Sequence, residues 1–144
     1  MAIYFAYGSN MDRSQLEDRV DKTLPRGVAR LDDYEVRFNK RSKYGSGKAN
    51  IVWRVGSSVE GGLYELTDEQ LADLDEYEIG YHRVTVIVTR NGTPESVVTY
   101  MADPDQIDDN LAPSAKYLET IKRGAQAFGL SREYQERLTA TKTR

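Results

Sequence analysis

Cysteine is absent from the 144-residue sequence, and His82 is the only histidine. The lack of cysteine excludes disulfides, a thiolate nucleophile and Cys-ligated zinc, and it is compatible with a reducing cytosol. A single histidine cannot supply a His-rich metal site. We therefore predict no metal centre.

Long apolar runs are also missing. No run approaches about 18 residues, and the N-terminus shows no basic segment followed by an apolar one, so neither a membrane span nor a signal peptide is predicted. Twenty Lys and Arg against 23 Asp and Glu give a net charge of −3, and no global positive field would attract nucleic acid. We expect a soluble cytoplasmic protein that binds neither membrane nor nucleic acid.

The order of predicted elements indicates an α+β fold in one domain over residues 1–144. Apolar and alternating patterns predict strands, capping residues and three-to-four spacing predict helices, and Asn91-Gly92 predicts a hairpin turn. Strands are expected over 2–7, 28–39, 49–55, 59–66, 81–90 and 95–101, and helices over 13–19, 68–77, 114–128 and 131–138. We predict a small, mixed, mostly antiparallel sheet, strongly curved or closed into a barrel, with peripheral helices and a frayed tail over 139–144.

The first predicted strand stops abruptly at Gly8-Ser9-Asn10. Successive backbone amides after a strand can form a nest for a carboxylate or an oxyanion, and glycine permits a positive φ and close approach of a ligand. A tight surface turn is an equally weighted alternative. A serine triad of Ser9, His82 and an aspartate is disfavoured, because no Gly-x-Ser-x-Gly motif supports it.

A second candidate site residue, Glu78, follows the predicted helix over 68–77. The apolar stripe set by Leu71 and Leu74 extends to Glu78, so its carboxylate should face the interior. Lost hydration and the negative end of the helix dipole would raise its pKa towards the range useful for proton transfer. Alternatively the helix ends earlier and Glu78 turns to solvent, and Asp75 is the competing carboxylate.

Residues 40–48 form a basic, glycine-containing segment. Gly45-Ser46-Gly47-Lys48 resembles part of a Walker loop, but Ser42 and Ala49 stand where glycine and Ser or Thr are required. The favoured interpretation is a solvated, mobile hairpin tip rather than an RNA-binding segment. A role beside an anionic substrate remains open.

A glutamate and a nest of amides suit a reaction in which the substrate carries its own nucleophile. Three segments fit that chemistry and together resemble the γ-glutamylcyclotransferase family (AIG2-like fold). They are Tyr7-Gly8-Ser9-Asn10-Met11, Leu74-Asp75-Glu76-Tyr77-Glu78, and the C-terminal region from Pro113-Ser114-Ala115-Lys116-Tyr117 through Glu133-Tyr134-Gln135-Glu136-Arg137-Leu138. The resemblance extends over nearly the whole chain.

This resemblance implies a cyclotransferase-type fold, no cofactor and a small γ-glutamyl substrate. The implied reaction is lyase-type: γ-glutamyl amino acids, or γ-glutamyl amines, give 5-oxoproline and a free amine, as in glutathione metabolism. A non-catalytic module that binds γ-glutamyl or acidic ligands is the alternative of another class. A homodimer is compatible with the resemblance, although no exposed apolar stripe in the sequence argues for one.

The resemblance also assigns roles to individual residues. Glu78 matches the catalytic glutamate, a general acid and base, and Tyr7 to Met11 match the loop whose amides hold the γ-glutamyl group. Tyr117 matches a tyrosine lining the pocket, and Tyr81 is a further candidate. Where the family usually has glycine directly after the glutamate, this sequence has Ile79, and Gly80 comes one position later. The helix end could therefore be displaced by one residue, which would change the direction of the Glu78 side chain.

Overall fold

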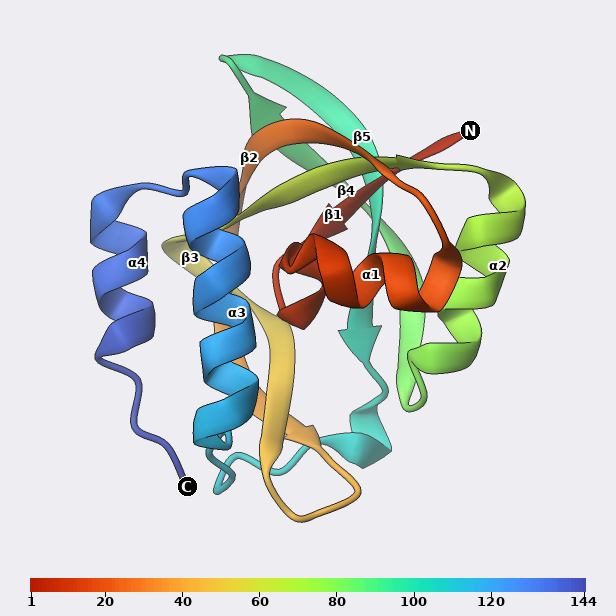
Figure 1. Ribbon diagram of the computed structural model, residues 1–144. Coiled ribbons are helices and arrows are strands. Elements are labelled where there is room, and N and C mark those ends of the chain that lie inside the picture. The colour runs from red at the N-terminus through yellow and green to blue at the C-terminus, as the bar shows by residue number, and fades with distance from the viewer.

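The computed structural model describes residues 1–144 and shows a closed five-stranded barrel (Figure 1). Its strands lie in the order β1-β3-β2-β4-β5, and all recorded pairs are antiparallel except the parallel pair of β1 and β5. The strands are β1 (Ala2–Ala6), β2 (Leu24–Arg41), β3 (Gly47–Leu66), β4 (Tyr81–Arg90) and β5 (Thr93–Ala102). This confirms the predicted mixed, mostly antiparallel barrel.

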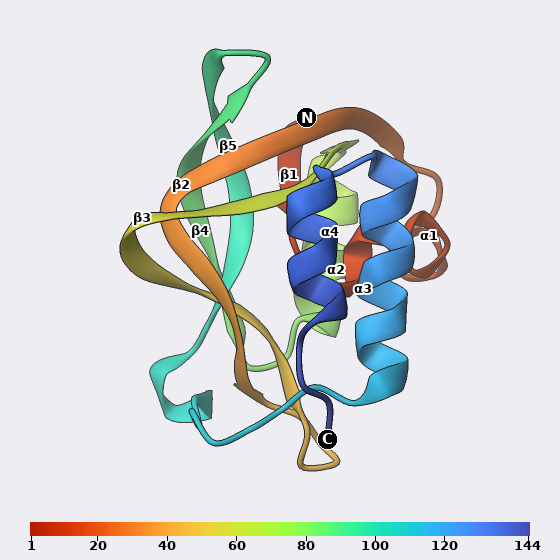
Figure 2. The same cartoon turned by 90° about the vertical axis from the view of Figure 1, so that its left-hand side faces the viewer.

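Four α-helices surround the barrel, as the sequence predicts. They are α1 (Arg13–Val20), α2 (Asp68–Tyr77), α3 (Ala115–Phe128) and α4 (Arg132–Thr139). Short 3-10 turns, η1 (Ser9–Met11) and η2 (Pro104–Gln106), follow β1 and β5. Helices α3 and α4 lie side by side, and α1 contacts α2 (Figures 1 and 2).

Local capping chemistry sets the helix ends. Thr67 and Gln70 form the predicted capping box at the start of α2. The Asp12, Ser114 and Ser131 side chains accept hydrogen bonds from the first turns of α1, α3 and α4. The residues that position the site therefore lie on elements whose ends are fixed by nearby sequence.

Two predicted strands, 49–55 and 59–66, are one continuous strand, β3. The predicted turn at Gly56-Ser57-Ser58 is instead an irregularity in the pairing of β2 with β3, between the pairs Asp32–Ser58 and Tyr34–Trp53. The Gly56 amide donates to Asp33 Oδ1 at 3.0 Å. This hydrogen bond holds the extra residues of β3 within the ladder, so the strand bends instead of reversing.

The C-terminal tail makes defined contacts. Thr139 closes helix α4, and the Arg144 amide donates to the Pro113 carbonyl at 2.8 Å. The Arg144 guanidinium donates to the Tyr44 carbonyl at 2.7 Å. The predicted fraying of 139–144 is therefore opposed at Arg144 by two hydrogen bonds.

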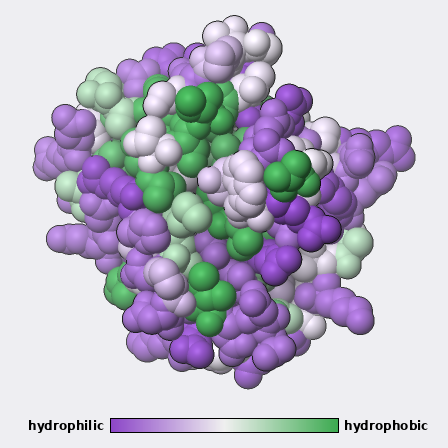
Figure 3. Space-filling view, turned by 180° about the vertical axis from the view of Figure 1, so that it is seen from behind, coloured by the Kyte–Doolittle hydropathy of each residue, from purple (hydrophilic) through white to green (hydrophobic).

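A single cluster of 26 buried apolar residues joins the barrel interior to the helices. Phe5, Leu63 and Leu74 are fully buried within it. Seen from behind, the surface carries hydrophobic residues in patches with hydrophilic residues around them (Figure 3). None of the helices combines the length and apolar character that crossing a membrane requires.

Candidate active site

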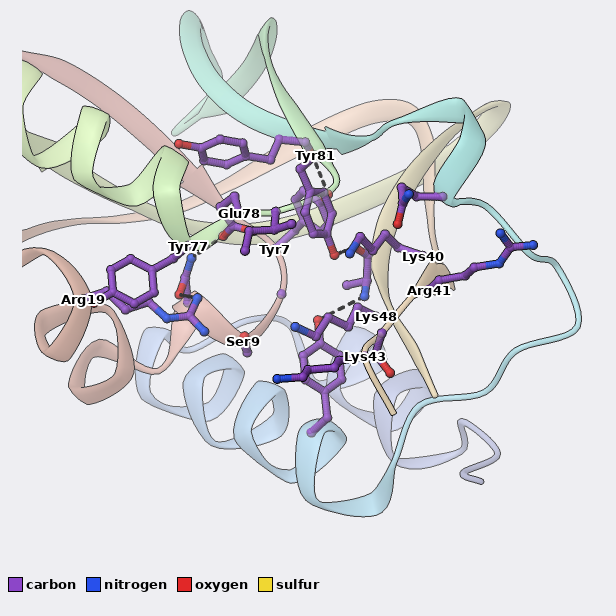
Figure 4. Close-up of a pocket in the computed structure, with 18 of the residues that line it drawn as sticks. Tyr7, Ser9, Arg19, Lys40, Arg41, Lys43, Lys48, Tyr77, Glu78 and Tyr81 are labelled. Carbon is purple, nitrogen blue, oxygen red and sulfur yellow. Dashed lines mark hydrogen bonds between the residues drawn. The ribbon is translucent and has the colours of Figure 1, made fainter. Parts of the chain in front are cut away.

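A cavity of about 580 Å³ lies where β1, β2 and α2 end and β3 and β4 begin, and α3 supplies Tyr117 to its wall. Seven of the eight sequence-predicted site residues line it (Figure 4). These are Tyr7, Gly8, Ser9, Asn10, Glu78, Tyr81 and Tyr117. The structure therefore brings the loop after β1 and the end of α2, which lie far apart in the sequence, into one site.

Glu78 is the only carboxylate among the lining residues. Helix α2 ends at Tyr77, and Glu78 forms its C-cap, with its amide donating to the Leu74 carbonyl at 3.1 Å. The side chain is partly exposed and enters the cavity, where Oε1 accepts a hydrogen bond from Asn10 Nδ2 at 2.9 Å. Leu71 and Leu74 are buried as predicted, so the apolar stripe does aim this glutamate inward.

The turn after Glu78 contains the departure from the family pattern. Ile79 is 77% exposed, and Gly80 has a φ of +83°, a conformation that favours glycine. The Tyr81 amide donates to the Glu78 carbonyl at 3.2 Å, which closes the turn. Placing the glycine one residue later still leaves the Glu78 carboxylate in the cavity.

Burial raises the pKa of the Glu78 carboxyl above its ordinary value. The positive charges of Arg19, Lys48 and Lys40, together with the Asn10 hydrogen bond, oppose this by stabilising the ionised form. The raised pKa moves this carboxyl towards the range in which a side chain can both take and return a proton.

Asp75, the competing carboxylate, is engaged elsewhere. It forms an ion pair with Arg83, Nη2 to Oδ2 2.6 Å, and accepts a hydrogen bond from the Tyr100 hydroxyl at 2.6 Å. These partners, Arg83 first, hold the pKa of Asp75 below its usual range. Asp75 does not line the cavity, and it is not available as the base.

The loop after β1 presents free backbone donors. The amides of Gly8, Ser9 and Asn10 have no acceptor in the protein, whereas the next two amides close the 3-10 turn. Gly8 does not use the positive φ that glycine permits, because its φ is −112°. The space at this position is tight: a Cβ atom would lie 3.3 Å from Ala49 Cβ.

Met11 does not line the cavity, which corrects the sequence prediction. It is 1% exposed and packs in the core, and its carbonyl accepts from the Tyr64 hydroxyl at 3.2 Å. The physical reason is the 3-10 turn: successive side chains point about 120° apart, so the side chains after Gly8 cannot share one face.

The Ser9, His82 and aspartate triad does not form. Ser9 Oγ accepts a hydrogen bond from Gln15 Nε2 at 2.7 Å. His82 Nδ1 pairs with Asp103 Oδ1 at 2.8 Å, and neither residue lines the cavity. The one histidine of the chain is thus separated from the serine that it would have to activate.

Tyrosines make up much of the cavity wall. Tyr81 donates its hydroxyl to the Ala49 carbonyl at 2.8 Å, and the Tyr117 hydroxyl accepts from the Ala49 amide at 3.0 Å. Burial raises the pKa of Tyr117 to about 12 and raises that of Tyr7 as well. These phenols remain neutral, and they shape the cavity wall.

The basic segment 40–48 is not simply a solvated tip. Lys40 is 6% exposed, and it lines the cavity with Arg41, Lys43 and Lys48. Only residues 42–46 form the turn between β2 and β3. The prediction of a solvated tip is therefore wrong for Lys40, and the alternative of a segment beside the substrate site fits its position.

Further lining residues were not predicted as site residues from the sequence, among them Arg19, Tyr4, Tyr77 and Tyr100. Arg19 lies over the Tyr77 ring, with Cζ 5.4 Å from its centroid, and donates to Asn10 Oδ1 at 3.2 Å. The Tyr4 hydroxyl accepts from Asn10 Nδ2 at 3.0 Å. The apolar run over residues 2–7 was the available signal, and it indicated a buried strand without pointing to a site residue.

Comparison with known proteins gives consistent matches. Residues 4–119 match the family model described as "Gamma-glutamyl cyclotransferase, AIG2-like". The chain is 30% identical over 148 residues to the gamma-glutamylcyclotransferase of Mus musculus, covering 96% of this chain and 77% of that protein, and the Homo sapiens protein gives the same values.

Solved structures match as well. A gamma-glutamyl cyclotransferase structure superposes with a TM-score of 0.91 at 30% identity, covering 99% of this chain and 89% of the other. YkqA from Bacillus subtilis superposes with a TM-score of 0.82 at 25% identity, covering 99% of this chain and 56% of the other.

Proposed function

Because the chain belongs to the gamma-glutamyl cyclotransferase, AIG2-like family and is an enzyme of the cyclotransferase type, we propose that it is a lyase-type enzyme that converts γ-glutamyl compounds to 5-oxoproline. The substrate's own α-amine attacks its γ-carbonyl, and the amine on the other side of the amide bond is released. Glu78 acts as the general acid and base, and no cofactor takes part.

One observation carries the proposal. The cavity holds a single carboxylate, Glu78, in a wall that also presents the amides of Gly8, Ser9 and Asn10 without protein acceptors. A base and an anion nest facing one cavity are the two parts that an intramolecular aminolysis requires.

The proton movements balance. Glu78 takes a proton from the α-ammonium, and the free amine attacks the γ-carbonyl carbon. The loop amides bind the α-carboxylate or the oxyanion that develops on the carbonyl. As the amide C–N bond breaks, Glu78 gives its proton to the leaving nitrogen. The attacking nitrogen loses a second proton as the lactam forms, and Glu78 passes this proton to the leaving amine as well. Overall the α-nitrogen loses two protons and the leaving nitrogen gains two, so Glu78 ends ionised, as it began.

So spare a site can suffice because the reaction closes a five-membered ring. Nucleophile and electrophile are held in one molecule, and effective molarities of such attacks reach about 10⁵ M or more. The neutral tyrosines around Ala49 shape the cavity and hold the folded-back substrate against Glu78.

The test is a panel of γ-glutamyl amino acids and γ-glutamyl amines incubated with the purified chain and assayed for 5-oxoproline. We expect 5-oxoproline and the free amine in equal amounts from at least one class. Calorimetric binding of the same compounds without any release would instead identify a non-catalytic binding module.

The pH dependence of kcat/KM gives a second prediction. Glu78 must be ionised to accept a proton, so activity rises as pH rises through its pKa. Because burial raises that pKa, the acidic limb lies at a higher pH than for an exposed glutamate. Asn10→Ala removes a hydrogen bond that favours the ionised form, so the limb moves further up, measured in initial-rate profiles.

The matched control for this profile is His82→Asn. His82 lies outside the cavity, and the acidic limb should stay where it is in the unmodified enzyme. If His82→Asn moved the acidic limb and Asn10→Ala did not, the result would contradict the role of Glu78.

A further inference from the structure

The cavity is far more positive than the proposed reaction requires. Five cationic side chains line it against the one carboxylate of Glu78. Arg19 lies on one side of Glu78, and Lys40, Lys43, Lys48 and Arg41 lie on the other (Figure 4). Arg41 points farthest from Glu78 and marks the rim.

None of these five cations lies within 4.0 Å of a carboxylate, whereas most of the other Lys and Arg side chains of the chain do. Outside the cavity most positive charges therefore have an acidic neighbour, whereas none of those lining the cavity has one. Charges lining a cavity with low-dielectric walls raise the local concentration of oppositely charged ligands.

Lys40 is the most informative of the five. It is 6% exposed and makes no hydrogen bond or ion pair through its side chain, and its Nζ lies 5.1 Å from the centroid of the Tyr81 ring. A Cβ atom at Gly80 would lie 2.7 Å from Lys40 Cε, so the glycine leaves the space that Lys40 occupies beside the Glu78 turn. The Nζ atom itself still reaches the solvent of the cavity, but an ammonium that is partly desolvated without an anionic partner carries a free-energy cost.

The strand register adds to that cost. Lys40 on β2 pairs directly with Lys48 on β3, and like charges opposite each other destabilise a sheet. Two lysines facing each other at the wall of a cavity form a site for an anion that bridges them, and such an anion would remove both penalties.

Of the two roles proposed for the loop amides of Gly8, Ser9 and Asn10, binding the substrate's α-carboxylate leaves Lys40 and Lys48 to another part of the substrate. The group left to meet Lys40 and Lys48 is the leaving amine. A cationic polyamine would be repelled there, and a neutral amino acid would bring a single carboxylate to four cations.

Building on the proposed function, we propose that the enzyme prefers γ-glutamyl substrates whose leaving group is an acidic amino acid, and that Lys40 and Lys48 recognise its carboxylates, with Lys43 and Arg41 at the rim. Substrates of the γ-glutamyl-glutamate or γ-glutamyl-aspartate type bring two carboxylates to this side of the cavity. The recognition is electrostatic and requires no change in the chemistry at Glu78.

The test compares kcat/KM for γ-glutamyl-glutamate and its near-isosteric neutral analogue γ-glutamyl-glutamine, with 5-oxoproline as the readout. We expect the acidic substrate to be preferred by about tenfold or more, the effect of one charge-assisted hydrogen bond. Lys40→Met and Lys48→Met should each bring the ratio towards one by lowering kcat/KM for the acidic substrate. Lys22→Met, an exposed lysine outside the cavity, should leave the ratio unchanged.

Salt provides a measurement that does not depend on how a variant folds. In the unmodified enzyme, kcat/KM for the acidic substrate should fall with ionic strength more steeply than for the neutral analogue, because salt screens the additional attraction. Equal turnover and equal salt dependence of the two substrates would overturn the proposed specificity while leaving the cyclotransferase function intact. Absence of 5-oxoproline from both would count against the function itself.

Discussion

Glu78→Gln is expected to abolish most 5-oxoproline formation, with kcat falling by about 10²- to 10⁴-fold, the usual contribution of a general acid and base. Glutamine keeps the size of the side chain, and its Oε1 can still accept the hydrogen bond that Asn10 Nδ2 makes at 2.9 Å. It cannot take a proton from the α-ammonium. Initial rates of 5-oxoproline release measure the effect.

The matched control is Glu76→Gln on the same helix, whose side chain is exposed and outside the cavity. It should retain the activity of the unmodified enzyme. Circular dichroism and calorimetric titration of a γ-glutamyl compound should show that Glu78→Gln still folds and binds. Full activity in the Glu78 variant would remove this residue from the mechanism.

Gly8→Val is expected to cost about 100-fold or more in kcat/KM, the penalty that a misplacement of about 1 Å can carry. A Cβ atom at position 8 would already lie 3.3 Å from Ala49 Cβ and 3.5 Å from the Tyr117 hydroxyl, and the valine methyl groups need further space. The loop must shift, and its free amides then no longer point where the anion binds.

Ser9→Ala is the comparison for this variant. The Ser9 hydroxyl accepts from Gln15, and its backbone amide survives the substitution, so the loss should be much smaller than for Gly8→Val. Thermal unfolding of both variants would separate a displaced loop from a destabilised fold. If Ser9→Ala proved as inactive as Glu78→Gln, the serine side chain would have a chemical role that backbone binding does not explain.

The proposed charge preference extends the same division of the cavity. In this proposal the loop amides and Glu78 act on the γ-glutamyl part, which every substrate shares, and the cations of β2, β3 and their connecting turn bind the part that varies. Substitutions at Lys40 or Lys48 should therefore change which substrate is used, whereas substitutions at Gly8 or Glu78 change whether any is used.

Short-range sequence patterns were sufficient to predict many local features of this protein. The capping box of Thr67 and Gln70, the hairpin turn at Asn91-Gly92 and the stripe of Leu71 and Leu74 that turns Glu78 inward all depend on residues close in sequence. Hydrogen bonding and side-chain periodicity over one or two turns determine such features. All the residues that take part lie close together in the sequence, so the features can be predicted from it.

The charged wall of the cavity depends on how the barrel closes, which the sequence did not reveal. Arg37 pairs with Asn50 and Lys40 with Lys48, so β2 carries one more residue than β3 across this stretch, and no local pattern announces that shift. Lys40 is buried in the cavity wall, and Arg19 reaches it from α1. By itself the sequence determined the candidate glutamate, Glu78, and the loop after the first strand. The charged surroundings were decided by strand register and helix packing, because these depend on contacts between distant segments.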